Sequence, residues 1–136
     1  MKLGTIYIAG KISGLDPKDV QIKFDEAAKK FEQIGFDVII PVQIVHQYAD
    51  GFNTDWDTAM ELCMEKLTEA THIYMLQDWQ DSNGAIIEHE KAKELNLSII
   101  YQKNTSPTKL NYGCIFLLFA CFLFWATILF LILKFI

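Results

Sequence analysis

The sequence contains no arginine, few cysteines and few histidines, and each scarcity argues against a class of function. Seventeen acidic residues against twelve lysines give a net charge of −5, whereas a protein that binds nucleic acid needs a basic face. The same balance disfavours a domain that lies flat on anionic lipid. Three cysteines without a regular spacing form no disulfide framework, which is typical of a reducing compartment. The histidines lack ligand spacing, so we expect no metal. We also expect no cofactor, and the acidic balance predicts no nucleic-acid partner.

Long hydrophobic runs are also missing, except for one at the C-terminal end. Residues 112–136 contain a single charge, Lys134, and about 20 apolar residues in a helix span a bilayer core of about 30 Å. A domain of this size cannot enclose so long a helix that is apolar on every side, so we expect a transmembrane helix over 112–136. Lys103 and Lys109 precede it, which favours an N-terminal domain in the cytoplasm. The predicted localisation is a membrane, through a single-pass C-terminal anchor after a linker at 103–111.

The first 102 residues alternate between short apolar runs and amphipathic stretches. Strands are predicted over 5–9, 37–40, 72–76 and 97–101, and helices over 17–34, from 54 or 55 to about 67, and from the turn at 81–84 to about 95. Residues 42–53 are predicted to form a loop. The alternation is typical of an α/β domain in which helices sandwich a parallel sheet. In the last helix we expect Ile87, Ala92 and Leu95 to face the core and His89 to be exposed.

The densest group of polar residues, 78–88, begins at the end of the third predicted strand. Ligands of parallel sheets bind beyond the carboxyl ends of the strands, so we expect a site here. Ser82 is a good N-cap, which directs the free amides of the first helical turn at an anion such as phosphate. Gly84 allows close approach of a ligand, and Glu88 lies one turn further on the same face. A glutamate in this position can act as a nucleophile on an anomeric carbon.

Each of these residues also has a simpler interpretation. A helical glutamate such as Glu88 is ordinarily solvated, and Ser82 can be a cap and nothing more. Asp78 and Asp81 fit ordinary turn chemistry. Trp79 suits packing or a lid over a site as well as stacking on a base. Taken one at a time, the residues favour these structural interpretations.

A wider set of motifs resembles one known superfamily. The set is Ile6-Tyr7-Ile8-Ala9-Gly10 with Ile12, Ser13 and Gly14; Pro41; Trp56 and Met60; Ile73-Tyr74-Met75-Leu76; then Trp79, Ser82, Gly84-Ala85 and Glu88. Together these motifs resemble the nucleoside 2-deoxyribosyltransferase-like superfamily, and within it the DUF4406 family, over residues 3–102. The resemblance implies a flavodoxin-like fold, so the expected architecture is a flavodoxin-like α/β domain plus one C-terminal transmembrane helix.

The resemblance also implies an activity and roles for particular residues. Characterised relatives cleave the N-glycosidic bond of 2-deoxynucleosides or their 5′-monophosphates through a deoxyribosyl ester on the glutamate that matches Glu88. By the same resemblance, Tyr7 contacts this nucleophile or the sugar. Gly10 and Gly14 line the site with their backbone, and Ser82 lies near the 5′-phosphate, as in the hydrolases of the group. Relatives build the site from more than one subunit, so the resemblance implies a homo-oligomer.

The chain departs from the family pattern at several positions. Thr71 and Cys63 stand where relatives carry aspartates, Asp78 stands where they carry a glycine, and Lys11 stands where many carry a proline. The Lys11 amine can neutralise a phosphate, or it is an exposed loop residue. Because the acid that assists the leaving base is missing from its usual places, Asp78 and Asp81 become the candidates for that role.

Three hypotheses of function follow. The first is a membrane-tethered enzyme that cleaves the N-glycosidic bond of a nucleoside or nucleotide. Its catalytic residues would be Glu88, Tyr7, Asp78 and Asp81, and its substrate-binding residues Gly10, Lys11, Gly14, Trp79, Ser82 and Gly84. The alternative is a non-catalytic nucleotide-binding sensor coupled to the membrane anchor, which would tolerate Glu88→Gln. The third is a membrane-directed interaction or defence protein whose toxicity would follow the apolar segment alone.

Overall fold

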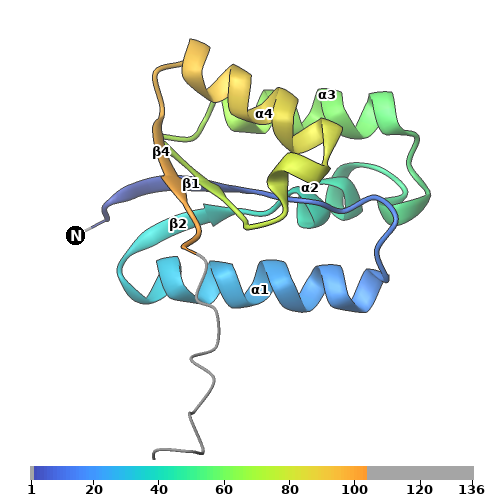
Figure 1. Cartoon of the computed structure of the whole chain (residues 1–136), viewed down its shortest axis with the longest axis horizontal. Coiled ribbons are helices and arrows are strands. Elements are labelled where there is room, and N and C mark those ends of the chain that lie inside the picture. Colours follow the sequence, from blue (N-terminus) through green and yellow to red (C-terminus); the bar gives the residue numbers. More distant parts are fainter. Residues whose placement is uncertain (1, 104–136) are drawn as a thin grey trace, which may run out of the picture. The chain divides into compact units, whose positions relative to one another are not determined.

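The computed structural model describes residues 2–103, which contain a four-stranded parallel sheet (Figure 1). The strands are β1 (Gly4–Ala9), β2 (Phe36–Ile39), β3 (His72–Met75) and β4 (Ser98–Tyr101). They are ordered β2-β1-β3-β4, and each neighbouring pair is parallel. This order matches the first four strands of flavodoxin-like sheets. The predicted flavodoxin-like α/β fold is therefore confirmed for the described residues.

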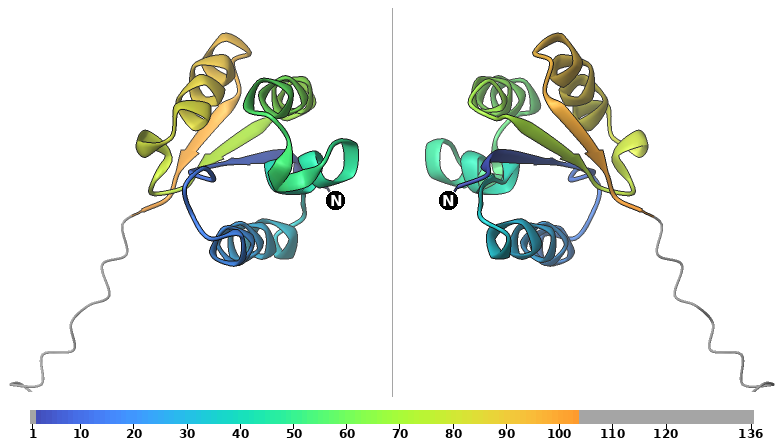
Figure 2. Two further views of the ribbon diagram at one scale, coloured as in Figure 1. Left: turned by 90° about the vertical axis from the view of Figure 1, so that its right-hand side faces the viewer. Right: turned by 90° about the vertical axis from the view of Figure 1, so that its left-hand side faces the viewer.

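Helices cover both faces of the sheet. Figure 2 shows α1 (Pro17–Gln33) alone on one face, with α3 (Trp56–Leu67) and α4 (Asn83–Glu94) together on the other. A further helix, α2 (Pro41–Tyr48), follows the edge strand β2 directly. Two short 3₁₀ turns, η1 (Gly51–Asn53) and η2 (Trp79–Asp81), precede α3 and α4. Because the strands are parallel, the segments that follow β1, β2 and β3 all begin at the same edge of the sheet.

The α1 face holds one of two hydrophobic cores. Asp16 caps α1 by accepting a hydrogen bond from the Lys18 amide at 2.8 Å, and Pro17 occupies the first turn, where its missing N–H costs nothing. The buried side of the helix carries apolar residues at helical spacing: Val20, Phe24, Ala27 and Ala28. They pack against alternate residues of the strands, among them Ile6, Ile8 and Tyr74.

The α3 and α4 face holds the second core, and this core positions the candidate site. Because side chains of a strand alternate between faces, Tyr7 points to the side opposite Ile6 and Ile8. Tyr7 is completely buried there, together with residues of α3 and α4: Cys63, Leu67, Ala85 and Ala92. The strand thereby places one polar hydroxyl beneath two helices.

Three local predictions were wrong. Residues 41–48 form α2 rather than the start of a loop, because Pro41 fits the first turn of a helix and Val42 and Ile44 are buried by it. Ile87 is 43% exposed, although it was expected to face the core. His89 is only 5% exposed, although it was expected in solvent. The core-facing side of α4 carries Ala85, Glu88, His89 and Ala92, so two polar residues occupy positions that hydrophobicity alone assigns elsewhere.

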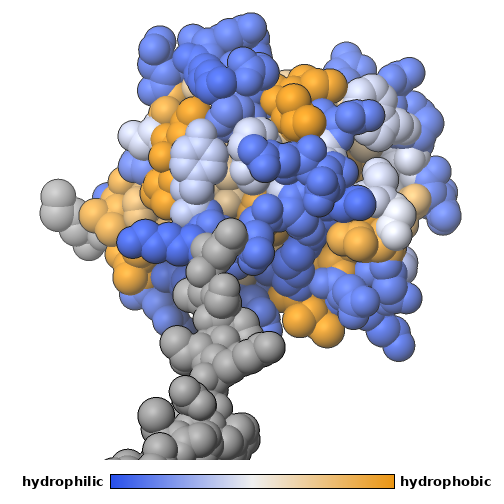
Figure 3. All heavy atoms as spheres, viewed as in Figure 1, coloured by the Kyte–Doolittle hydropathy of each residue, from blue (hydrophilic) through white to orange (hydrophobic). Residues whose placement is uncertain are grey.

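The exterior of the described domain is mixed in character. On the face drawn in Figure 3, hydrophobic side chains form several separate patches between hydrophilic ones. Within residues 2–103, no helix has both the length and the apolar character needed to cross a membrane. The predicted transmembrane helix at 112–136 lies outside the described residues, as does nearly all of the predicted linker.

Candidate active site

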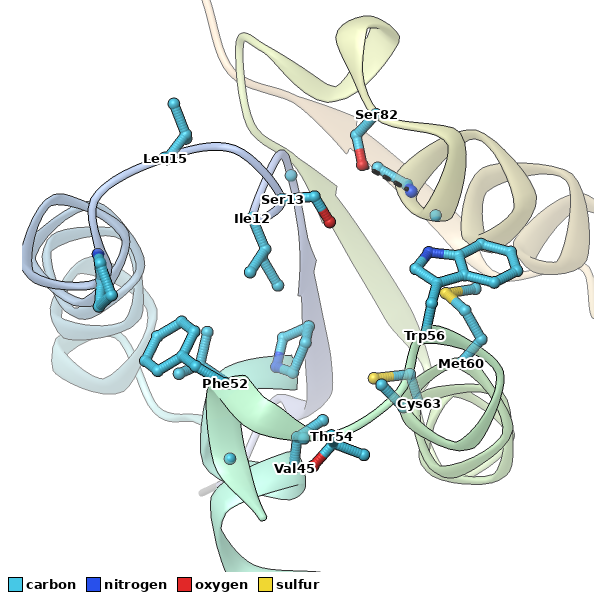
Figure 4. Close-up of a pocket in the computed structure, with 18 of the residues that line it drawn as sticks. Ile12, Ser13, Leu15, Val45, Phe52, Thr54, Trp56, Met60, Cys63 and Ser82 are labelled. Atoms are coloured by element: carbon cyan, nitrogen blue, oxygen red, sulfur yellow. Dashed lines mark hydrogen bonds between the residues drawn. The ribbon is translucent and has the colours of Figure 1, made fainter. Parts of the chain in front are cut away.

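A cavity of about 390 Å³ lies beyond the carboxyl ends of β1 and β2, between these ends and the start of α4 (Figure 4). Its walls come from the loop after β1, from α2, from η1 and the residue after it, from α3 and from the first turns of α4. The volume is within the range of small-molecule sites, and the position is where open α/β sheets bind ligands. Five of the residues predicted for the site line it: Gly10, Gly14, Ser82, Gly84 and Glu88.

Glu88 is the most unusual residue of this cavity. It is 4% exposed, and the Tyr7 hydroxyl donates a hydrogen bond to its Oε1 at 2.6 Å. Eighty-one positions separate the two residues in the chain, and they meet because β1 and α4 pack against each other. The structure thus places Tyr7 behind the predicted nucleophile, while Glu88 also faces the cavity.

The setting of Glu88 and Tyr7 shifts the pKa values of both. Burial raises the pKa of Glu88 from 4.5 to about 8, although the hydrogen bond from Tyr7 acts in the opposite direction. Burial, and then the charge of Glu88, raises the pKa of Tyr7 well above its ordinary value. Tyr7 therefore stays protonated and acts as a hydrogen-bond donor. A carboxyl group with a pKa near neutrality inside a cavity is a common mark of an active site.

Cys63 lies beside this pair on α3 and also lines the cavity. Burial, and then the charge of Glu88, raises the pKa of the Cys63 thiol to about 12. The thiol therefore carries its proton at neutral pH, and it contributes no second negative charge next to Glu88.

The start of α4 forms the wall next to Glu88. The Ser82 hydroxyl accepts a hydrogen bond from the Ala85 amide at 3.3 Å, as predicted for an N-cap. A Cβ atom at Gly84 would meet the Met60 sulfur at 3.1 Å, so the absence of a side chain keeps the helix start close to α3. The amides of this first turn border the cavity and favour an anionic ligand.

Lys11 and Asp81 border a second depression of about 450 Å³. The cavity that Glu88 lines is called the main cavity below. The second depression shares Ser13, Trp56, Ser82 and Gly84 with it, so the two adjoin at the start of α4. The lysine and the aspartate, both predicted for the site, therefore lie next to the cavity that holds Glu88 rather than in it.

Asp78 and Trp79 point to other partners. Asp78 forms an ion pair with Lys23 of α1 at 2.7 Å and accepts a hydrogen bond from the Lys11 amide at 3.2 Å. Asp78 thereby connects the loop after β1 to α1, and it lines neither the main cavity nor the depression next to it. Trp79 borders a third depression, of about 420 Å³, where it packs on His89 with ring centres 4.5 Å apart. Both residues thus have structural partners in the described part of the chain.

Other residues of the main cavity were not predicted for the site. They are mainly apolar or aromatic and include Val45, Phe52, Trp56, Met60 and, among polar residues, His46 and Thr54 (Figure 4). Several come from residues 42–53, which were predicted to form a loop. A loop prediction does not indicate which side chains point toward the site. Trp56 and Met60 belonged to the motifs of the resemblance, and that was the one signal available for them.

The cavity combines a candidate nucleophile, Glu88, with a hydrogen-bond donor to it, Tyr7, and with walls that are mainly apolar. Within residues 2–103, no group of three or more histidine, cysteine or acidic residues is placed to hold a metal ion. Glu88 can attack an electrophilic carbon once it is ionised, Tyr7 can hold it in position, and the aromatic and aliphatic walls suit a flat group of a ligand.

Comparison with known proteins gives a family but no activity. The family model described as "Domain of unknown function (DUF4406)" matches residues 4–101, well over half of the chain. No curated protein matches the chain. The matched segment includes every strand of the sheet and every residue that lines the main cavity. The chain therefore belongs to the DUF4406 family.

Proposed function

We propose that the domain cleaves the N-glycosidic bond of 2-deoxynucleosides or their 5′-monophosphates, with Glu88 as nucleophile. The observation that carries the proposal is the buried Glu88 carboxyl, which receives a 2.6 Å hydrogen bond from Tyr7 at the wall of a cavity of ligand size. The motifs that resemble the nucleoside 2-deoxyribosyltransferase-like superfamily supply the substrate class. Without them, the same geometry would suit any substrate with an electrophilic carbon.

In the proposed reaction, the Glu88 carboxylate attacks the anomeric carbon of the sugar. The C1′–N bond breaks, its electron pair goes to the base, and a deoxyribosyl ester forms on Glu88. Water then displaces the ester and restores the carboxylate. Tyr7 stabilises the ionised form of Glu88 before the attack, because its hydroxyl donates to the carboxylate. Hydrolysis is preferred over base exchange, since Ser82 replaces the acidic residue that the transferases tend to carry.

The adjoining depression suits the 5′-phosphate of a nucleotide. It combines the Lys11 side chain with Ser13, Ser82 and the start of α4, which together offer a positive charge, hydroxyl groups and free amides. Asp81 also borders this depression and would repel a phosphate. The preference for a nucleoside or a monophosphate therefore depends on whether the ligand lies closer to Lys11 or to Asp81.

The test is base release by the full chain, purified with detergent present. The chain is incubated with the common 2-deoxynucleosides and their 5′-monophosphates, and free base is followed by chromatography. We expect release from at least one substrate, and a loss of more than about a thousandfold in Glu88→Gln. Glu94→Gln is the matched control, since Glu94 lies on α4 with a 67% exposed side chain, and it should keep full activity. No release from any substrate would refute the proposal.

A non-catalytic sensor is the second candidate, and two observations favour it. No carboxylate other than Glu88 lines the main cavity in the described part of the chain, and burial holds the pKa of Glu88 at about 8. A protonated Glu88 can bind a nucleoside but cannot attack it. A sensor predicts that a nucleotide raises the melting temperature of wild type and Glu88→Gln alike, without base release from either.

Two further elements belong to the same proposal. Residues 112–136 tether the domain to a membrane, as their composition predicts, and Lys103 and Lys109 ahead of them favour the cytoplasmic side for the domain. The site is completed in a homo-oligomer, as the resemblance implies. Carbonate extraction of membranes tests the tether, and crosslinking of the full chain tests the oligomer.

A further inference from the structure

Cleavage of an N-glycosidic bond needs a proton donor for the departing base, and the predicted donors are poorly placed. Asp78 is committed to Lys23 and to the Lys11 amide. Asp81 borders the adjoining depression rather than the main cavity. The titratable side chains that do line the main cavity are Glu88, Cys63 and His46. Glu88 is assigned as nucleophile, and the buried Cys63 thiol is too weak an acid to give up its proton near pH 7.

His46 is held in a defined position by the turn that follows α2. Its ring meets the Phe52 ring edge-on, with centres 5.1 Å apart. Gly51 adopts a φ of +59° beside it, and a Cβ atom at Gly51 would collide with the imidazole ring. A glycine at this point both forms the turn and makes room for the ring. Within residues 2–103, neither ring nitrogen of His46 takes part in a hydrogen bond, so the imidazole is available to a ligand.

A hydroxyl elsewhere in the cavity gives independent evidence that the cavity meets a polar ligand. Thr54 follows η1 and lines the same cavity. Its Oγ1 is the one buried side-chain oxygen or nitrogen in residues 2–103 that has no hydrogen-bond partner. Buried polar atoms are nearly always paired, so this hydroxyl is best explained by a partner that arrives with the ligand. Figure 4 places Val45 and Thr54 on the side of the cavity away from Ser82 and the start of α4.

We infer that His46, which lies on α2 and lines the cavity, is the general acid that protonates the base as it leaves. The inference rests on the proposed function and assigns the missing role to a residue outside the predicted site. A histidine suits it because an imidazole ordinarily exchanges its proton near neutral pH.

The proton balance closes with His46 in this role. As Glu88 attacks the anomeric carbon, the C1′–N bond breaks and the imidazolium of His46 gives its proton to the base nitrogen. Water then attacks the same carbon, and the C1′–O bond to Glu88 breaks. The water proton passes to the neutral imidazole, which restores the imidazolium, and the carboxylate of Glu88 is free again. The net change is nucleoside and water to free base and sugar.

The experiment uses the full chain with detergent and the deoxynucleoside or monophosphate that the wild type turns over fastest. Base release is compared among the wild type, His46→Gln, Glu88→Gln and His72→Gln. The last is a matched control, because His72 begins β3 at the opposite end of the strand from the cavity. We expect His46→Gln to lower kcat by about 10²–10⁴-fold with little change in KM, and His72→Gln to stay within about twofold. In His46→Gly, added imidazole should restore part of kcat, which a merely structural role would not predict.

The outcomes separate the two proposals. If the wild type releases base and Glu88→Gln does not, while His46→Gln keeps kcat within about threefold, the enzyme stands and His46 is not its acid. His46 is equally excluded as the acid if His46→Gln changes KM alone, or if imidazole fails to rescue His46→Gly. If the wild type releases no base from any substrate, both proposals fail together. His46 is exposed, so a melting temperature close to wild type is expected for His46→Gln, and one lowered by the cost of a glycine in α2, about 1 kcal/mol, for His46→Gly. A cooperative melting transition confirms that both variants are folded.

Discussion

Two adjacent residues of α4, Glu88 and His89, are equally buried but have very different surroundings. Glu88 is 4% exposed and His89 is 5% exposed. Among residues 2–103, the Glu88 side chain has one hydrogen bond, from Tyr7, and it faces a cavity. The ring of His89 is bonded at both nitrogens, to Tyr101 at 2.8 Å and to Glu90 at 3.3 Å, and it packs on Trp79.

The difference in hydrogen-bond partners distinguishes a side chain that is available for chemistry, Glu88, from one that stabilises the fold, His89. A carboxylate has about four acceptor sites, so Glu88 keeps unused capacity that faces the cavity, and burial destabilises its charge. His89 has no capacity left, because both ring nitrogens are paired and the ring is stacked. Burial of a polar side chain is therefore weak evidence of function until its partners are counted. Four changes would sharpen or break this contrast.

The largest effect concerns Glu88 and pH. Its pKa is raised from 4.5 to about 8 in the folded chain, so between these values the folded state holds a proton that the unfolded state has lost. Stability is then fully present below about pH 4.5 and declines as pH rises through about 8, by on the order of 3–5 kcal/mol from this group. Glu88→Gln cannot ionise and removes the decline. The melting temperature of the variant should exceed that of wild type by a margin that grows from pH 5 to pH 8.5.

Glu94→Gln serves as the control for this series, because Glu94 lies at the exposed end of the same helix. Its melting curve should follow that of wild type at every pH. Parallel pH profiles for wild type and Glu88→Gln would mean that Glu88 ionises in the folded chain as easily as in water, and the contrast with His89 would disappear.

The second effect is on stability through His89. His89→Ala removes a stacked ring beneath Trp79 and leaves a cavity, which costs about 2–3 kcal/mol. Base release should stay within about fivefold of wild type, since His89 does not line the main cavity. Tyr101→Phe removes the hydrogen bond alone and should cost less than about 1 kcal/mol, because half of Tyr101 is exposed. Thermal melting and base release on the same preparations check both expectations.

Much of the fold could be predicted because it depends on local patterns. The short apolar runs indicated the four strands, and Asp16 and Ser82 marked the starts of two helices by their capping chemistry. Loops that follow parallel strands meet at one edge of a sheet, so the general position of the site was also predictable.

The failures have a common physical cause, which is that hydrophobicity alone does not determine the direction of a side chain. In α4 the isoleucine at 87 was expected in the core, whereas the spacing of Ala85, Glu88 and Ala92 marks the side that is in fact buried. Tertiary partners 81 and 12 positions away, Tyr7 and Tyr101, make that burial possible, and no local pattern reveals them.

The third effect concerns Tyr7, the partner that distinguishes Glu88. Tyr7→Phe keeps the buried ring but removes the donor to Glu88, which costs about 1–2 kcal/mol. The hydrogen bond lowers the pKa of Glu88, so its loss raises that pKa above about 8. The decline of melting temperature with pH, which starts near pH 4.5 in both proteins, should then continue to a higher pH than in wild type. Base release at pH 7 should fall, because less of Glu88 is ionised. An unchanged pH profile would show that Tyr7 does not set the ionisation of Glu88.

The smallest effect tests whether Asp78 is available for chemistry, as Glu88 is, or stabilises the fold, as His89 does. Its side chain is 31% exposed, and its partners are the Lys23 amine at 2.7 Å and the Lys11 amide at 3.2 Å. If it is structural, Asp78→Asn lowers stability by about 1 kcal/mol, because a partly buried ion pair is weakened, and base release stays within about threefold. Asp37→Asn, which breaks the more exposed pair with Lys2, should leave both quantities unchanged. A loss of base release beyond a hundredfold in Asp78→Asn, with the melting temperature kept, would instead place Asp78 in the chemistry and displace His46 as the proton donor.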